Sequence, residues 1–227
     1  MGFIAFHPCE RCGSRDNKAE YDSNYYCFGC GFVEQKRSLS RFKTQTEPRV
    51  CDGITLEKSL PVEAKKWLLA YHLTNEEMEQ FKYSRERVTK YGQKRCNLLV
   101  LIARGDYWLA RNLDDGVRYL SSGVKPYLEY GVKSNTLVFV EDVISAVKVG
   151  RIATAVPMLG ASVLRDWWDN AKKYDRIIIW GDRDKASQNV TQAKRASELV
   201  GKKVEIIITD KDPKEYSTKE LDNFIKV

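Results

Sequence analysis

The sequence predicts an α/β protein whose C-terminal part is a parallel sheet with helices on both faces. Three observations support this class: apolar segments without polar alternation recur between helix-like segments from residue 136 onward, a basic segment precedes them, and two cysteine pairs begin the chain. The predicted parts are a cysteine-containing module (1–34), a basic linker (35–52), a basic α+β subdomain (53–135) and the parallel-sheet domain (136–227).

The composition argues against a membrane protein and favours a polyanionic partner. Hydrophobic residues make up 43% and charged residues 30% of the chain, which is ordinary for a soluble globular protein. The longest apolar run, Leu98 to Ala103, is far shorter than the ~18 residues of a membrane helix, and the N-terminus does not read as a signal peptide. We therefore expect a cytoplasmic protein whose net charge of +7 attracts a polyanion.

Two Cys-x2-Cys pairs near the N-terminus have the spacing of a zinc ribbon. The pairs are separated by 14 residues, and four thiolates at this spacing suit one tetrahedral zinc ion. Disulfide pairing is the alternative, but an intracellular location argues against it. The predicted zinc ligands are Cys9, Cys12, Cys27 and Cys30.

The neighbours of these cysteines refine the prediction. Gly13 and Gly31 follow the second cysteine of each pair, where a glycine can take positive φ. With four cysteines available, His7 is expected to stand outside the ligand set, and Cys51 and Cys96 are expected to be structural. The aromatic residues between the pairs are expected partly to pack under the metal and partly to offer a stacking surface for single-stranded nucleic acid.

Residues 53–135 predict two helices and a hairpin. Segment 60–73 has a helical apolar pattern, and Thr74 with Glu77 forms a capping box that opens a second helix. Segments 97–103 and 107–113 are apolar and separated by a short turn, which predicts a hairpin.

The segment 82–95 within this subdomain is strongly basic. It holds six basic residues and a single acid, Glu86, with two tyrosines between them. Phosphates would supply the counter-charge and the tyrosines could stack on bases. The alternative interpretation is a solvated helix face.

From residue 136 the pattern alternates between strands and helices. Apolar strands that are separated by helices imply a parallel sheet, and ligands of such sheets bind at the carboxyl ends of the strands. The predicted strands are 136–140, 176–180 and 203–209, and the predicted helices are 142–150, 160–174, 185–201 and 217–225, the last with a capping box of Ser217 and Glu220.

Acidic residues follow three of these strands. Glu141 follows the first, Asp182 and Asp184 the second, and Asp210 and Asp212 the third. Carboxylates gathered at one edge of a sheet are costly unless a hard divalent cation such as magnesium or manganese neutralises them. The alternative is that individual acids cap helices, for which Asp142 and Asp184 are suited.

These motifs resemble a known family. "VFVEDVISAVKVG", "WGDRD" and "KDPKE" resemble the Toprim domain of DNA primases and topoisomerases, in which a glutamate, an Asp-x-Asp and, in primases, an Asp-Pro follow successive strands. The four-cysteine module resembles the template-reading zinc ribbon of bacterial and bacteriophage primases. "RCNLLVLI", "WLARNLD" and "VRYLSSG" are similar to the primase-core strands that carry nucleotide-facing basic residues, so the resemblance covers nearly the whole chain.

The resemblance implies a DNA primase, a nucleotidyltransferase that makes short RNA primers on single-stranded DNA from ribonucleoside triphosphates for DNA replication. It implies a bacterial host cell and, because the chain has no P-loop, a separate replicative helicase. The implied magnesium or manganese ligands are Glu141, Asp182, Asp184 and Asp212. The implied nucleotide- and template-binding residues are Arg95, Arg111, Arg118, Arg85, Arg87 and Lys90.

The chain departs from the family pattern in two places. The family usually has Glu-Gly-x-x-Asp where this chain has Glu141, Asp142 and Ser145, and Arg118 stands where a lysine is common. Two other functions are compatible with parts of the pattern. A non-catalytic recombination mediator of the RecR kind joins a four-cysteine module to Toprim but generally lacks the Asp-x-Asp. A Toprim nuclease would use the same acids without needing the ribbon.

Overall fold

The computed structural model describes residues 3–22, 24–35, 53–89 and 91–226. The predicted linker lies outside these ranges except for Gln35, as do Cys51 and Lys90. The chain forms two compact units, Met1–Leu39 with Tyr127–Val227 and Ser40–Pro126. In the described part of the chain, every helix is too short or too polar to cross a membrane.

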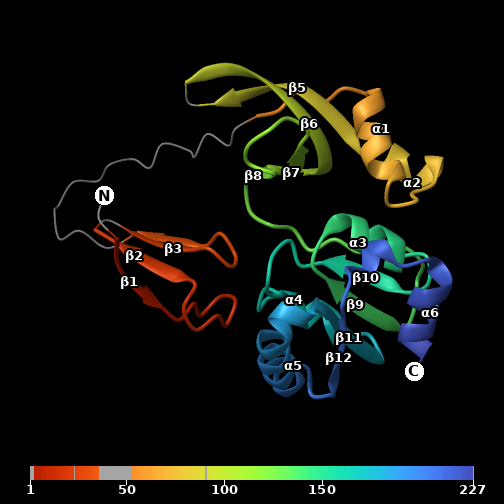
Figure 1. Ribbon diagram of the computed structural model, residues 1–227. Coiled ribbons are helices and arrows are strands. Elements are labelled where there is room, and N and C mark those ends of the chain that lie inside the picture. Colours follow the sequence, from red (N-terminus) through yellow and green to blue (C-terminus); the bar gives the residue numbers. More distant parts are fainter. Residues whose placement is uncertain (1–2, 23, 36–52, 90, 227) are drawn as a thin grey trace. The chain divides into compact units, whose positions relative to one another are not determined.

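The N-terminal part of the first unit is a small antiparallel sheet that carries the four cysteines (Figure 1). Its four strands lie in sequence order, and successive strands pair as antiparallel neighbours. The strands are β1 (Phe3–His7), β2 (Lys18–Tyr21), β3 (Asn24–Cys27) and β4 (Val33–Gln35).

The C-terminal part of the first unit is a four-stranded parallel sheet in the order β10-β9-β11-β12, which confirms the predicted fold class. All three predicted strands form, as do three of the four predicted helices over nearly their whole length. The strands are β9 (Thr136–Val140), β10 (Thr154–Pro157), β11 (Arg176–Asp182) and β12 (Val204–Thr209); the helices are α3 (Val143–Val149), α4 (Trp167–Ala171), α5 (Ala186–Val200) and α6 (Thr218–Lys226), with 3-10 turns η1 (Arg183–Lys185) and η2 (Pro213–Glu215).

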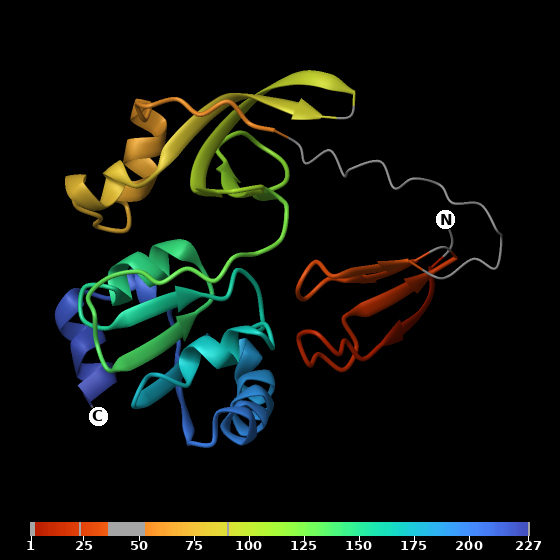
Figure 2. The same ribbon diagram turned by 180° about the vertical axis from the view of Figure 1, so that it is seen from behind.

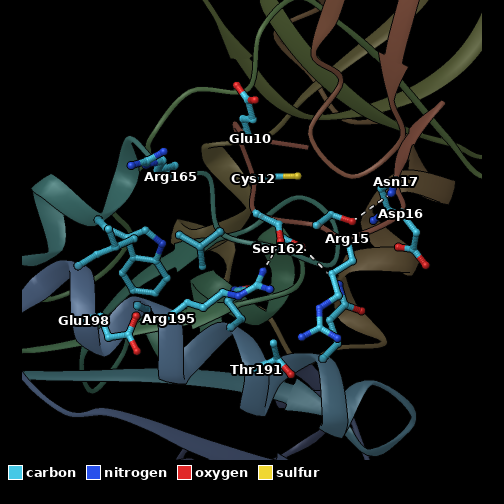
Figure 3. Close-up of a pocket in the computed structure, with 18 of the residues that line it drawn as sticks. Glu10, Cys12, Arg15, Asp16, Asn17, Ser162, Arg165, Thr191, Arg195 and Glu198 are labelled. Atoms are coloured by element: carbon cyan, nitrogen blue, oxygen red, sulfur yellow. Dashed lines mark hydrogen bonds between the residues drawn. The ribbon is translucent and has the colours of Figure 1, made fainter. Parts of the chain in front are cut away.

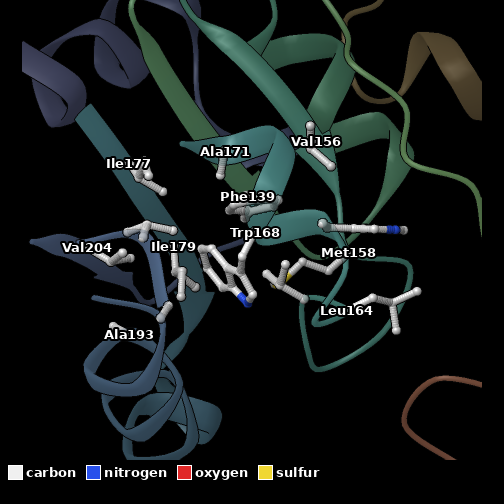
Figure 4. Close-up of a cluster of buried hydrophobic side chains, with 14 of the residues drawn as sticks. Phe139, Val156, Met158, Leu164, Trp168, Ala171, Ile177, Ile179, Ala193 and Val204 are labelled. Atoms are coloured by element: carbon white, nitrogen blue, oxygen red, sulfur yellow. The ribbon is translucent and has the colours of Figure 1, made fainter. Parts of the chain in front are cut away.

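The side chains of alternate residues in each strand pack into two different cores, one on each face of this sheet. On one face, Phe139 and Ile179 pack with Trp168 of α4 and Ala193 of α5 (Figure 4). On the other face, Val138, Ile178 and Trp180 pack with α3 and α6. Strands that are buried on both faces need apolar residues at every position, which is why β9 and β11 show no polar alternation.

Two sequence-based expectations for this domain need correction. Of the predicted helix 160–174, only α4 forms. Leu159 and Gly160 take φ of 54° and 148°, and the chain makes turns before the helix begins at Trp167. Val163 and Leu164 still reach the core from these turns, which gave the segment its helix-like apolar pattern. Strand β10 was not predicted; it is a short edge strand that ends in a proline.

The second unit contains two short helices and a four-stranded antiparallel sheet (Figure 2). The predicted hairpin is confirmed by β6 and β7, and the predicted capping box by mutual hydrogen bonds of Thr74 and Glu77. The basic segment 82–95 forms a second hairpin from β5 and β6, so its interpretation as a helix face is wrong. The elements are α1 (Val62–Leu69), α2 (Asn75–Glu79), β5 (Lys82–Thr89), β6 (Gly92–Arg104), β7 (Tyr107–Asn112) and β8 (Tyr119–Ser122).

Candidate metal centres and basic surface

The four N-terminal cysteines form a buried cluster that could hold one zinc ion. Their sulfur atoms lie within 4.8 Å of one another, and all four residues are free thiols rather than disulfides. The Sγ atoms of Cys9 and Cys30 are 3.8 Å apart, and those of Cys12 and Cys27 are 3.6 Å apart. A tetrahedron with Zn–S bonds of ~2.3 Å has edges of about 3.8 Å, so the cluster has the size that zinc requires.

The electrostatics of the cluster also favour a bound cation. A hydrogen bond from Cys12 lowers the pKa of Cys30 to about 5, whereas burial raises the pKa of Cys27 to about 11. The pKa of Cys12 is raised by its hydrogen bond to Cys30 and by burial. Four thiolates therefore cannot coexist here without a positive charge among them.

The surroundings of the cluster agree with the sequence-based expectations. Gly13 and Gly31 both have φ of 71°, and their backbone amides donate to the carbonyls of Cys9 and Cys27 at 2.8 Å. His7 is outside the cysteine cluster and instead hydrogen-bonds Glu20. These turns fold each Cys-x2-Cys segment so that both of its sulfur atoms face the same point.

The acids at the carboxyl edge of the parallel sheet converge only in part. Asp182, the last residue of β11, shares a hydrogen bond with Asp212 and lies within electrostatic reach of Glu141. Burial, the Asp212 bond and the two neighbouring charges raise the pKa of Asp182 to about 7, while Asp212 keeps a lowered pKa through Lys214 and Asp182. One proton shared by two carboxyl groups is the expected result of such crowding.

Two lysines supply positive charge to this edge. Lys185 Nζ donates to both carboxylate oxygens of Glu141 at 2.7 Å. Lys214 Nζ donates to Asp142 Oδ2 at 2.9 Å and also contacts Asp212. Lys185 closely follows Asp184 but pairs with Glu141, which follows β9, and Lys214 bridges Asp142 before α3 and its near neighbour Asp212.

The remaining acids take other roles. Asp184 is exposed on the turn η1. The exposed carboxylate of Asp210 pairs with Arg183 at 2.9 Å. Asp142 caps α3 by accepting hydrogen bonds from Ser145 N at 2.9 Å and Ser145 Oγ at 3.1 Å, as the helix-cap interpretation expected for this residue.

Within the described residues, the cysteine cluster is the one place where three or more potential metal ligands lie within 4.8 Å of one another. The carboxylates Glu141, Asp182 and Asp212 are neighbours, but they do not form so tight a group. The positive charges beside them are the ammonium groups of Lys185, which contacts Glu141, and of Lys214, which contacts Asp212.

The β5–β6 hairpin presents a basic surface in the second unit. Arg87 lies opposite Lys94 in the strand register, a like-charged pair that destabilises a hairpin unless an anion lies nearby. Arg95 lies opposite Glu86, and Arg85 pairs with Glu57 at 3.2 Å. Tyr91 at the turn is 88% exposed, so an aromatic ring is presented between the basic residues. Of the predicted residues here, only Lys90 lies outside the described part.

The other two predicted arginines lie on the same antiparallel sheet. The Arg111 guanidinium lies over the rings of Trp67, at 5.6 Å, and Tyr119, at 5.2 Å. Its Nε atom is buried without a hydrogen-bond partner in the described residues. Arg118 is exposed just before β8. Both arginines therefore belong to one end of the β7–β8 pair.

Neither a protein-family model nor a curated protein matches the chain, so its function has to be inferred from the residues and their geometry.

Proposed function

We propose that the chain is a Toprim-type DNA primase that makes short RNA primers on single-stranded DNA. The observation that carries the proposal is the meeting of Glu141, Asp182 and Asp212 at the carboxyl edge of a parallel sheet, with the pKa of Asp182 raised to about 7. Perturbed carboxyl groups at this edge are typical of functional sites. A four-cysteine ribbon and a basic hairpin in the same chain support a nucleic-acid substrate.

The donor set at the sheet edge fits magnesium or manganese. Both ions prefer carboxylate oxygens, and a divalent cation would take over the neutralising role of the shared proton and of Lys185. Glu141, Asp182, Asp184 and Asp212 would hold the ion, Asp184 from its exposed position on η1. When bound, the ion would neutralise negative charge at the phosphate that is being transferred.

The side chains of the protein would supply the remaining functions. Arg95, Arg111 and Arg118 would bind the incoming nucleotide and the template. Arg85, Arg87 and Lys90 would bind template phosphates, since basic side chains bind single strands largely without regard to sequence. Nucleotidyl transfer uses the 3′-hydroxyl of the growing primer as nucleophile, so the protein needs no nucleophilic side chain.

The zinc ribbon would select the template. Its exposed aromatic side chains support this role, because bases stack on such rings. Phe6 is 57% exposed and Phe28 is 60% exposed, the second in edge contact with Tyr26 at 4.9 Å between ring centroids. A replicative helicase would be supplied as a separate protein in the cytoplasm of a bacterial host cell.

One assay separates this proposal from its two competitors. The protein is incubated with single-stranded DNA, labelled ribonucleotides and magnesium. Short labelled RNA indicates a primase, shortened DNA indicates a Toprim nuclease, and a gel shift without either product indicates a recombination mediator. The last two results would overturn the proposal.

Variants of the acids identify the site within this assay. We expect Asp182→Asn and Asp184→Asn each to lower primer synthesis by on the order of a thousandfold, because each removes a hard ligand at the transferring phosphate. DNA binding should persist, since the basic hairpin would supply most of it. Asp175→Asn is the matched control. Asp175 is an exposed acid that directly precedes β11, whereas Asp182 is the last residue of that strand, so this change should leave synthesis unchanged.

A further inference from the structure

Lys148 is a lysine in the interior of the parallel-sheet domain. It is 1% exposed and lies on α3, a helix whose residues are all buried and mostly apolar. Lysine is one of the residues least often buried, because its amino group loses its hydration unless another polar group replaces it. A buried lysine on an apolar helix therefore indicates a specific partner, and the proposed function gives this residue no role.

The partner of Lys148 is the turn that begins after Asp212. Nζ of Lys148 donates to the carbonyl of Lys214 at 2.8 Å, across 66 residues of sequence. Two preceding carbonyls accept hydrogen bonds within the turn η2 itself, that of Asp212 from Glu215 N at 2.9 Å and that of Pro213 from Tyr216 N at 3.3 Å. Lys148 thus adds a hydrogen bond from outside the turn to the carbonyl that comes next.

The helix α3 also contacts the same turn at a second point. Lys214 Nζ donates to Oδ2 of Asp142, the N-cap of α3, at 2.9 Å and contacts Asp212. The main chain of η2 is therefore bonded to the last turn of α3, and a side chain of η2 is bonded to the start of that helix. Asp212 is the N-cap of η2, so its position relative to Asp182 depends on these two bonds.

We propose that Lys148 is a positioning residue for the carboxylate edge: its buried amino group fixes η2, and η2 in turn holds Asp212 beside Asp182. The two carboxyl groups share a hydrogen bond in this arrangement. Its role toward a metal rests on the proposed function, which assigns Asp212 to the ion. Residues that orient a metal ligand typically contribute about 10- to 100-fold to metal affinity.

The test is titration of Mn²⁺ onto the full-length, zinc-loaded protein, with free Mn²⁺ measured by electron paramagnetic resonance. Lys148→Met should lower the Mn²⁺ affinity by at least about tenfold, because methionine fills the space of lysine without donating to the Lys214 carbonyl. Lys148→Arg keeps a donor and should stay closer to the wild type. A role in packing alone predicts the reverse order, since methionine matches the buried volume of lysine better than arginine does.

A double-mutant cycle shows whether Lys148 acts through Asp212. Asp212→Asn should itself weaken Mn²⁺ binding, and in that background Lys148→Met should have little further effect. An equal loss in both backgrounds would overturn the proposal, as would wild-type affinity of Lys148→Met. If Lys148→Met does not fold, Lys148→Gln takes its place with the same expected loss, because its side chain ends one atom short of the position of Nζ.

Hydrogen exchange of the amides in and after η2 provides a measurement that needs no metal. Lys148→Met should speed exchange at Glu215 and Tyr216 severalfold, because the turn loses an outside hydrogen bond. Arg195→Met is the matched control and should change neither exchange there nor Mn²⁺ affinity. Arg195 lines the cavity between α5 and the chain that follows the first cysteine pair, where its Nη1 likewise donates to a backbone carbonyl, that of Gly13 (Figure 3).

The two measurements separate failure of this proposal from failure of the proposed function. Unchanged exchange in Lys148→Met would overturn the positioning role. Faster exchange in this variant, without any Mn²⁺ binding by the wild type, would instead overturn the metal site of the proposed function.

Discussion

Asp182 lies where two other carboxylates and an ammonium group meet at the end of a strand. The sequence predicted that acids gather here, because parallel strands present their carboxyl ends at one edge. It could not predict how the acids are neutralised. Lys185 and Glu141 are 44 residues apart, and Lys214 and Asp142 are 72 apart, so these ion pairs exist only once the sheet has formed.

Asp182 should make the stability of the magnesium-free, zinc-loaded protein depend on pH. The pKa of its carboxyl group rises from an ordinary 3.8 to about 7 on folding, so the folded state holds a proton that the unfolded state releases. The protonated Asp182 contributes its full stabilisation below about pH 4. The free energy of unfolding then falls as the pH rises to about 7, and above pH 7 this contribution is absent. Asp182→Asn carries no titrating group at this position, so its melting temperature should increasingly exceed that of the wild type between pH 4 and 7.

The pH series is recorded by thermal denaturation of both proteins in parallel. Asp210→Asn serves as control, because Asp210 is an exposed acid near the same sheet edge. A constant difference between wild type and Asp182→Asn across this range would show that Asp182 is not the titrating group.

Gly181, next to Asp182, is required for the close packing of α5 on β11. A Cβ atom at this position would lie 1.8 Å from Nδ2 of the buried Asn189. We expect Gly181→Ala to lower the free energy of unfolding by about 1–3 kcal/mol, and Asn189→Ala in the same chain to recover part of that loss. Denaturant unfolding measures both values. Gly53→Ala is the control, since the nearest atom to its new methyl group is 3.9 Å away; a loss as large in this control would remove the packing explanation.

At the scale of elements, strands were predicted better than the segments between them. The runs that became β9, β11 and β12 are apolar on both faces, and capping boxes mark the starts of α2 and α6. The helix expected over 160–174 failed, because Val163 and Leu164 reach the core from turns whose backbone the apolar pattern does not encode. Strand β10 was missed because a run of four residues carries too little periodicity.

The β5–β6 hairpin should account for much of the salt dependence of DNA binding. Replacing Arg85, Arg87 and Lys90 with alanine removes three candidate phosphate contacts, so the slope of log K against log salt should fall by about 2 for a single strand. Binding should weaken to a similar degree for all sequences. Fluorescence anisotropy across a salt series measures the slope.

A charge-matched control tests whether position matters. Lys58, Lys65 and Lys66 lie in the same unit, outside the hairpin, and their replacement with alanine removes the same charge. If the two triple variants show equal slopes, the hairpin is not a specific contact surface.

At the scale of the whole molecule, the four-cysteine module and the parallel-sheet domain form one unit through contacts beside the cysteines. Arg165 N donates to the carbonyl of Arg11 at 3.0 Å, and Arg195 donates to that of Gly13. The cysteines also belong to the same apolar cluster as α4 and α5. The sequence predicted the ribbon from its spacing, but not this docking, because the contacts join backbone carbonyls to distant arginines.

Loss of zinc should release the four-cysteine module without unfolding the parallel sheet, because among the described residues each of the two sheets pairs only its own strands. Cys27→Ser removes a ligand, and a module of this size depends on its metal for folding. We expect loss of zinc and greatly increased proteolysis of residues 3–34, while the parallel-sheet domain stays protected. Cys96→Ser, whose thiol donates to the Ser84 carbonyl outside the cluster, should retain zinc and protection. Full zinc content in Cys27→Ser would contradict the four-cysteine assignment.

The hydrogen bond between Arg195 and Gly13 joins residues that are 182 positions apart, and this has a consequence for biosynthesis. Ribosomes add about 5–20 residues per second, so α5 leaves the ribosome on the order of ten seconds or more after the ribbon. During that interval the nascent ribbon can capture zinc but has no α5 to dock against. We expect the ribbon to be metallated while translation continues, which makes the availability of zinc at the ribosome a determinant of how much correctly assembled protein a cell obtains.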